Sequence, residues 1–205
     1  MSALLGCVGV SFSLLSLVSG CSTSHKAANS LQPQHAGTAT GVALTGEAVD
    51  PLSSSNAKAV VLVFVRTDCP IANRYAPEIE KLYQTFAARK VSWWLVYPDG
   101  ETSPTDIKRH LEEYHLSLKA LRDPAHDLVK LAGVSVTPEV AVFLANGHEV
   151  YHGRIDDRYE DFGKERPQAT RHDLAEVLNA VLQGKPVPAG GKAVGCYINE
   201  RTQKP

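Results

Sequence analysis

The residues of this chain best suited to chemistry are its cysteines, and Cys69 has the most informative setting. It lies in the stretch VLVFVRTDCPIANRYAPEIEKLY (61–83), between an apolar run and a run with helical spacing. A sulfur at the first turn of a helix faces unpaired backbone N–H groups and the positive end of the helix dipole. Both favour the thiolate, which is the nucleophilic form. The alternative is a buried, unreactive thiol, which is common among free cysteines.

Charged neighbours of Cys69 act in opposite directions. Arg66 and Arg74 are close in sequence and would favour a negative sulfur, whereas the adjacent Asp68 would oppose it. The balance depends on side-chain directions, so both outcomes stay open. Together with Thr67, the two arginines are candidates for the rim of a substrate site.

The second thiol of a redox pair cannot lie near Cys69 in sequence. Position 72 is alanine, so no Cys-x-x-Cys dithiol can form, and position 73 is asparagine, which rules out Cys-x-x-x-Cys. Cys196, in AVGCYI, follows the last predicted helix by a flexible stretch that can fold back. We expect it to approach Cys69 as a resolving partner. A static disulfide, a metal-binding pair and an unpaired tail cysteine are the alternatives.

The elements that position these residues alternate along the chain. An apolar β-branched run predicts a strand buried on both faces, and Cys69 and Pro70 then open a helix. Further strands and helices alternate before a hairpin, for which Asn146-Gly147 predicts a two-residue type I′ turn. Thr170 and Asp173 predict the capping of a last helix. The expected strands are 58–66, 91–98, 117–123 and the hairpin 139–155, and the expected helices begin at positions 70, 103, 125 and 171.

This order resembles the thioredoxin fold, an α/β architecture with a central mixed β-sheet flanked by helices. Two sites make the resemblance specific: the cysteine of TDCP at a helix start, and Thr137-Pro138 directly before a hairpin strand. The resemblance implies that Pro138 is a cis-proline facing Cys69 and shaping the substrate groove. It is closest to the redoxin group (peroxiredoxin-like, AhpC/TSA-related), whose extra strand and helix before the cis-proline correspond here to residues 99–133.

The resemblance implies a thiol oxidoreductase with Cys69 as nucleophile, without an organic cofactor. Protein thiols, disulfides or peroxides are the implied substrates. The chain departs from the peroxiredoxin motif Pro-x-x-x-Thr-x-x-Cys, because Leu62 and Arg66 stand at its proline and threonine positions. The alternative is a copper carrier of the same fold using Cys69, Cys196 and a histidine, or a scaffold that has lost its activity.

The N-terminus predicts export. Residues 1–20 have the length and apolar character of a signal peptide, and Val18-Ser19-Gly20-Cys21 resembles a lipobox, in which Cys21 would be lipidated. Residues 21–40 are small and polar, as in a flexible tether. The folded domain is expected over 41–185, followed by a tail, 186–205, that contains Cys196. An exported, membrane-anchored location would allow disulfides to form and persist.

The bulk composition restricts the remaining classes. The 205 residues carry a formal net charge of −1, which gives no indication of a nucleic-acid partner. Neither a Walker loop, nor a dinucleotide glycine fingerprint, nor HExxH is present. The charged loop 153–168 is most simply a connector. A rim role for it would rest on Arg154 and Asp156.

Overall fold

The computed structural model describes residues 39–53 and 56–198, which fall within one compact unit, His35–Pro205. The predicted signal peptide with Cys7, the lipidation site Cys21 and nearly all of the tether lie outside the described residues. Among the helices that the structure describes, none has the length and apolar character needed to cross a membrane.

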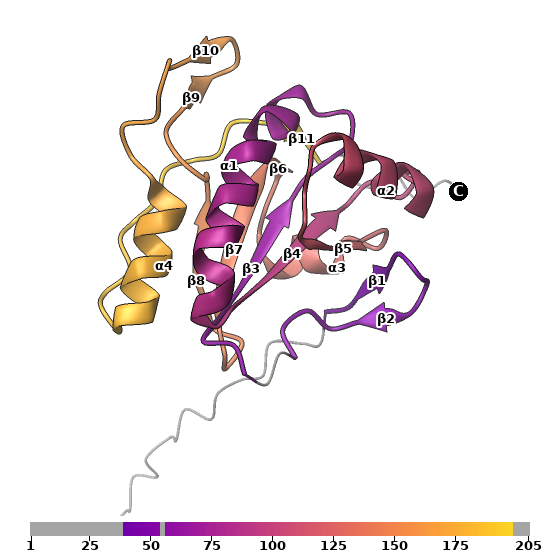
Figure 1. Cartoon of the computed structure of the whole chain (residues 1–205), viewed down its shortest axis with the longest axis horizontal. Helices are drawn as coiled ribbons and strands as arrows, with labels where there is room; N and C mark the ends of the chain where they lie inside the picture. Colours follow the sequence, from indigo (N-terminus) through magenta and orange to yellow (C-terminus); the bar gives the residue numbers. More distant parts are fainter. Residues whose placement is uncertain (1–38, 54–55, 199–205) are drawn as a thin grey trace, which may run out of the picture. The chain divides into compact units, whose positions relative to one another are not determined.

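A seven-stranded mixed sheet forms the centre of this unit (Figure 1). Its strands follow one another in the order β2-β1-β5-β4-β3-β7-β8. The three inner strands β3, β4 and β5 run parallel, while β7 and β8 on one side and β1 and β2 on the other are antiparallel to their neighbours. The strands are β1 Gly41–Ala43, β2 Ala48–Val49, β3 Ala59–Phe64, β4 Val91–Tyr97, β5 Lys119–Arg122, β7 Glu139–Leu144 and β8 Glu149–Gly153.

Helices cover both faces of the sheet, which confirms the predicted thioredoxin-type architecture. Alternate residues of β3 point to opposite faces. Val61 and Val63 pack with residues of α1, α2 and α4, whereas Val60 and Leu62 pack with α3. Every residue of β3 is buried, as its continuous apolar run predicts. The helices are α1 Pro70–Phe86, α2 Pro104–Glu113, α3 Asp127–Leu131 and α4 Asp173–Gln183, with a 3₁₀ turn, Ala87–Arg89, after α1.

Two further pairs of short strands lie outside the main sheet. β9 (Tyr159–Asp161) pairs with β10 (Lys164–Glu165), and β6 (Val136–Thr137) pairs antiparallel with β11 (Cys196–Tyr197). The sequence predicted no structure for the segment that contains β11. β6 leads directly into the Thr137–Pro138 peptide bond, which is cis as the resemblance implied.

Two local predictions are wrong. Asn146 does not have the positive φ that a type I′ turn needs. Instead, the Gly147 N–H donates to Leu144 O at 2.9 Å and Gly147 itself takes φ 79°, so the loop is one residue longer and ends on a left-handed glycine. Thr170 does not cap α4, because its N–H and hydroxyl both donate to the buried Asp157.

Candidate active site

Cys69 is the N-cap residue of α1, with an extended backbone at φ −86° and ψ 108°. Pro70 occupies the first helical position, where no backbone donor is lost. The Ala72 N–H donates to Cys69 Sγ at 3.4 Å, and the Cys69 thiol donates to Thr137 O at 2.9 Å. The sulfur therefore lies between two groups. The N-terminus of α1 favours the thiolate, and the Thr137 carbonyl accepts a hydrogen bond from the protonated thiol.

The structure brings Cys196 to the same place. β11 lies alongside β6 with Cys196 opposite Thr137, and the Thr137 hydroxyl donates to Cys196 O at 3.4 Å. The Ile198 N–H donates to Ser135 O at 3.0 Å, which extends the pairing by one residue. Both cysteines are free thiols. The tail thus delivers a second sulfur to the first by strand pairing.

The surroundings of Cys196 favour its protonated form. Burial raises the pKa of Cys196 to about 12, and both a side-chain hydrogen bond with Cys69 and the charge of that sulfur act in the same direction. The positive charge of Arg66 acts against them. Cys196 is therefore the thiol that keeps its proton, whereas Cys69 lies at the N-terminus of α1, which would stabilise a negative charge on its sulfur.

Cys69 has no exposed surface, which agrees with the burial that the alternative of a buried thiol predicted. The tail contributes to this burial, because Val194 and Cys196 pack against the same apolar cluster as Cys69. Gly195 fits closely: a Cβ at this position would overlap the Thr137 carbonyl and lie 3.1 Å from Pro138 N. An external substrate can therefore meet the sulfur only when the segment around Cys196 moves away.

The predicted rim residues separate into two groups. Arg66 pairs with Asp68 at 2.8 Å, so the two charges beside Cys69 largely offset each other, and its Nη1 also donates to Tyr197 O at 3.3 Å. The carbonyl of Thr67 accepts a hydrogen bond from Asn73. These residues belong to the turn that carries Cys69. By contrast, Arg74 is 65% exposed and pairs with Glu165 of β10.

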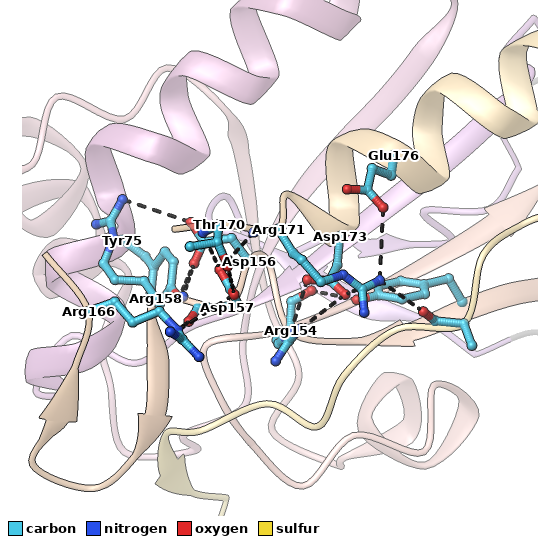
Figure 2. A network of polar contacts seen from close by, with 12 residues as sticks. Tyr75, Arg154, Asp156, Asp157, Arg158, Arg166, Thr170, Arg171, Asp173 and Glu176 are labelled. Carbon is cyan, nitrogen blue, oxygen red and sulfur yellow. Dashed lines mark hydrogen bonds and ion pairs between the residues drawn. The ribbon is translucent and has the colours of Figure 1, made fainter. Parts of the chain in front are cut away.

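Arg154 is one of the rim candidates in the charged loop. In the structure it belongs to a polar network that anchors the start of the tail (Figure 2). Its guanidinium bonds the buried Asp173 at 3.0 Å, and its backbone N–H donates to Gly191 O at 3.2 Å. Arg171, beside it, reaches Ala189 O at 3.5 Å. The network fixes the tail at residues 189–191, and the pairing with β6 then fixes residues 195–198.

Three residues with polar contacts to this region were not predicted as site residues: Asn73, Tyr97 and His110. They form a buried hydrogen-bonded chain that ends at Thr67 O. Their signal in the sequence is weak, because a single histidine in an amphipathic helix is usually a packing or surface residue. Among the described residues, no group of three or more His, Cys, Asp or Glu side chains could hold a metal ion.

The fold and the site together define a class: a thioredoxin-fold protein with a cysteine at the start of its first core helix, against the peptide bond of a cis-proline. Comparison with family models gives the family. The model described as "AhpC/TSA family" matches residues 34–152, and the chain belongs to that family, within the thioredoxin-like redoxin superfamily. The matched region includes Cys69 and Pro138 but ends before Cys196. No match was found among curated proteins.

Solved structures confirm the fold. An uncharacterized conserved protein from Geobacillus kaustophilus is 23% identical, with a TM-score of 0.70 over 80% of this chain and 89% of that one. The hypothetical protein SMc02350 from Sinorhizobium meliloti is 21% identical, with a TM-score of 0.69 over 80% and 91%. A secreted Mycobacterium tuberculosis disulfide oxidoreductase is 18% identical, with a TM-score of 0.50 over 71% and 96%.

Proposed function

We propose that this protein is a thiol–disulfide oxidoreductase whose redox pair is Cys69 and Cys196. The observation that carries the proposal is the pairing of β11 with β6, which sets Cys196 beside a cysteine at a helix N-terminus. Membership of a redoxin family and the described activity of the secreted M. tuberculosis structure support the same class of chemistry. The missing Cys-x-x-Cys partner is replaced by a thiol from the tail.

The reaction follows from the raised pKa of Cys196 and from the helix N-terminus beside Cys69. The Cys69 thiolate attacks one sulfur of a substrate disulfide, forms a mixed disulfide and expels the other substrate thiolate, which takes a proton from solvent. The negative charge on Cys69 is thereby consumed, and with it one cause of the raised pKa of Cys196. Cys196 then gives its proton to solvent, attacks Cys69 Sγ and expels the second substrate thiolate, which takes a proton from solvent in turn.

The net result is the transfer of two electrons from two protein thiols to one substrate disulfide, leaving a Cys69–Cys196 disulfide. The same steps in reverse oxidise a substrate dithiol. We rank disulfide exchange above peroxide reduction as the activity of this protein, because Leu62 and Arg66 replace the proline and threonine of the peroxiredoxin motif. Pro138 and the carbonyl of Thr137 border the sulfur and would shape the approach of a substrate.

The test is a peptide map under non-reducing conditions. Treatment of the full chain with oxidised glutathione should produce a peptide pair linked through Cys69 and Cys196, and dithiothreitol should release it. The linked pair should be absent from a Cys69→Ser variant. If no oxidant yields the linked pair, the proposed redox couple is wrong.

A copper carrier is the second candidate, because two adjoining thiols are also suitable ligands for Cu(I). The described residues provide no third ligand of the usual types beside them, which is why we rank this function lower. Stoichiometric Cu(I) binding that is lost in Cys69→Ser, in a protein without disulfide turnover, would favour the carrier.

Export to a membrane-anchored position completes the proposal. The lipobox-like sequence that ends at Cys21 and a redox function that needs an oxidising compartment support it. Mass spectrometry of the mature N-terminus should find acyl chains on Cys21, and an unmodified N-terminus would rule out the anchor.

A further inference from the structure

A buried polar chain connects β4 and α2 to the turn that carries Cys69. The Tyr97 hydroxyl lies 2.9 Å from His110 Nδ1, and His110 Nε2 lies 2.9 Å from Asn73 Oδ1. Asn73 Nδ2 in turn donates to Thr67 O at 3.0 Å. Tyr97 and His110 are 1% and 5% exposed, so the bond between them is closed to water, while Asn73 and Thr67 at the other end are half-buried. The dithiol reaction proposed above does not involve this chain of hydrogen bonds.

Each hydrogen bond in the chain has a defined direction. The carbonyl of Thr67 can only accept, so the Asn73 amide donates to it and presents its own oxygen to His110. His110 Nε2 must then carry the proton, which leaves Nδ1 to accept from the Tyr97 hydroxyl. Burial lowers the pKa of His110, against an opposing effect of Glu113, and this keeps the ring neutral as the chain requires.

Asn73 holds the Cys69 turn at two points. Its backbone N–H donates to Cys69 O at 3.0 Å, while its side chain holds Thr67 O. The Cys69 N–H donates to Arg66 O at 3.3 Å, and this hydrogen bond closes the same turn. These bonds maintain the extended backbone of Cys69, and that backbone directs Sγ to the Ala72 N–H.

We propose that Asn73 and His110 are positioning residues for the Cys69 nucleophile. His110 orients the Asn73 amide, and Asn73 fixes the turn, so that the sulfur stays against the N-terminus of α1. The inference rests on the proposed role of Cys69. Neither residue contacts the reacting sulfur through its side chain, and their effect is to hold the geometry in which the thiolate is stabilised.

The test compares variants in a full-length Cys196→Ser parent, in which a disulfide between the pair cannot form. Iodoacetamide labelling of Cys69 is followed at the level of its peptide by mass spectrometry. Asn73→Ala and His110→Phe should each slow the labelling of Cys69 about 10-fold, because a small displacement of a reacting group has a large effect on rate. His110→Gln should retain most of the rate, because its amide supplies one acceptor and one donor as the neutral ring does.

Asn179→Ala is the matched control, because Asn179 also accepts one hydrogen bond, from Arg89, but on α4. It should leave the labelling rate unchanged. Equal rates in the parent, Asn73→Ala and His110→Phe overturn the positioning role while leaving Cys69 as the nucleophile. A loss of rate in His110→Gln as large as in His110→Phe also overturns it, since hydrogen bonding is then not the cause. If Cys69 of the parent takes no label even when Gly195→Ala is added to release the tail, both proposals are overturned.

Discussion

At the scale of single residues, the two cysteines of the proposed redox pair lie in different surroundings. Cys69 has a helix N-terminus to accept its charge, whereas Cys196 lies in an extended strand with no such stabilisation. The pKa of Cys196 is raised by burial and by its partner sulfur, and for this reason Cys196 acts second in the proposed reaction. Arg66 and Asp68 offset each other beside the pair, which leaves the helix as the main source of positive potential.

This asymmetry predicts a trapped intermediate. In Cys196→Ser, reaction with 5,5′-dithiobis(2-nitrobenzoate) should leave the aromatic thiol attached to Cys69, because no second thiol can expel it. The wild-type chain should instead lose that group and form the Cys69–Cys196 disulfide, releasing two aromatic thiols for each pair. The mass of the Cys69 peptide distinguishes the two results. A stable adduct on wild-type Cys69 would show that Cys196 does not resolve it.

At the scale of elements, β11 both covers the site and supplies the second thiol. It is a two-residue strand held by its pairing with β6, by the Ile198 N–H on Ser135 O and by Arg66 on Tyr197 O. Each such hydrogen bond contributes only about 1 kcal/mol net. The end of the tail can therefore open without unfolding the domain, while residues 189–191 stay attached to the network of Arg154 and Arg171 (Figure 2).

Gly195→Ala should prevent this strand from docking, because the new Cβ would overlap the Thr137 carbonyl. We expect iodoacetamide to label Cys69 about 10-fold faster than in wild type. A ratio of this size corresponds to the free energy of about one hydrogen bond. Gly163→Ala is the control, since a Cβ at Gly163 would meet open space at the turn between β9 and β10. If Gly195→Ala left the labelling rate of Cys69 unchanged, the tail would not be what shields the sulfur.

At the scale of the described unit, a buried carboxylate holds together the loop after β8 and the start of α4. Asp157 is 6% exposed and accepts hydrogen bonds from the Thr170 hydroxyl and from the N–H groups of Thr170 and Arg171 (Figure 2). Burial alone would raise the pKa of Asp157. These bonds and the charge of Arg166 outweigh it and hold that pKa well below its usual range.

The lowered pKa of Asp157 predicts how stability depends on pH. The unfolded carboxyl titrates near a pKa of about 3.9, so the stabilisation is fully present above that pH and is lost as the pH falls below it. Asp157→Ala should lower the free energy of unfolding at pH 7 by about 1–3 kcal/mol in total, because its hydrogen bonds are lost while the donors on the exposed residues Thr170 and Arg171 can turn to water. Urea unfolding at pH 7 and pH 3 measures both effects.

Asp161→Ala provides the control for Asp157→Ala, because Asp161 lies in the same loop but is exposed. Its free energy of unfolding should stay close to the wild-type value at both pH values. The difference in stability between wild type and Asp157→Ala should be smaller at pH 3 than at pH 7. A constant difference would mean that the charge of Asp157 is not what stabilises the loop.

The sequence by itself determined the order of the main elements and the position of Cys69 at a helix start. These features are local, because they follow from apolar periodicity, from proline at a first helical position and from the order of strands and helices. The cis-proline before the hairpin strand was implied by the resemblance to the thioredoxin fold. A local signal of the same kind gave a wrong prediction at Thr170, which does not cap α4. Its side chain could cap a helix, but the buried Asp157 competes for it and is a stronger acceptor.

Only the tertiary structure decided that the tail forms β11, that it buries Cys69 and that Asn73, His110 and Tyr97 join in one chain. Residues 186–198 carry no periodic pattern, and a two-residue strand gains its stability from the edge of β6 rather than from its own sequence. The hydrogen bonds of His110 likewise depend on where α2 packs against α1 and β4. Contacts between segments distant in sequence depend on packing, and no local pattern encodes them.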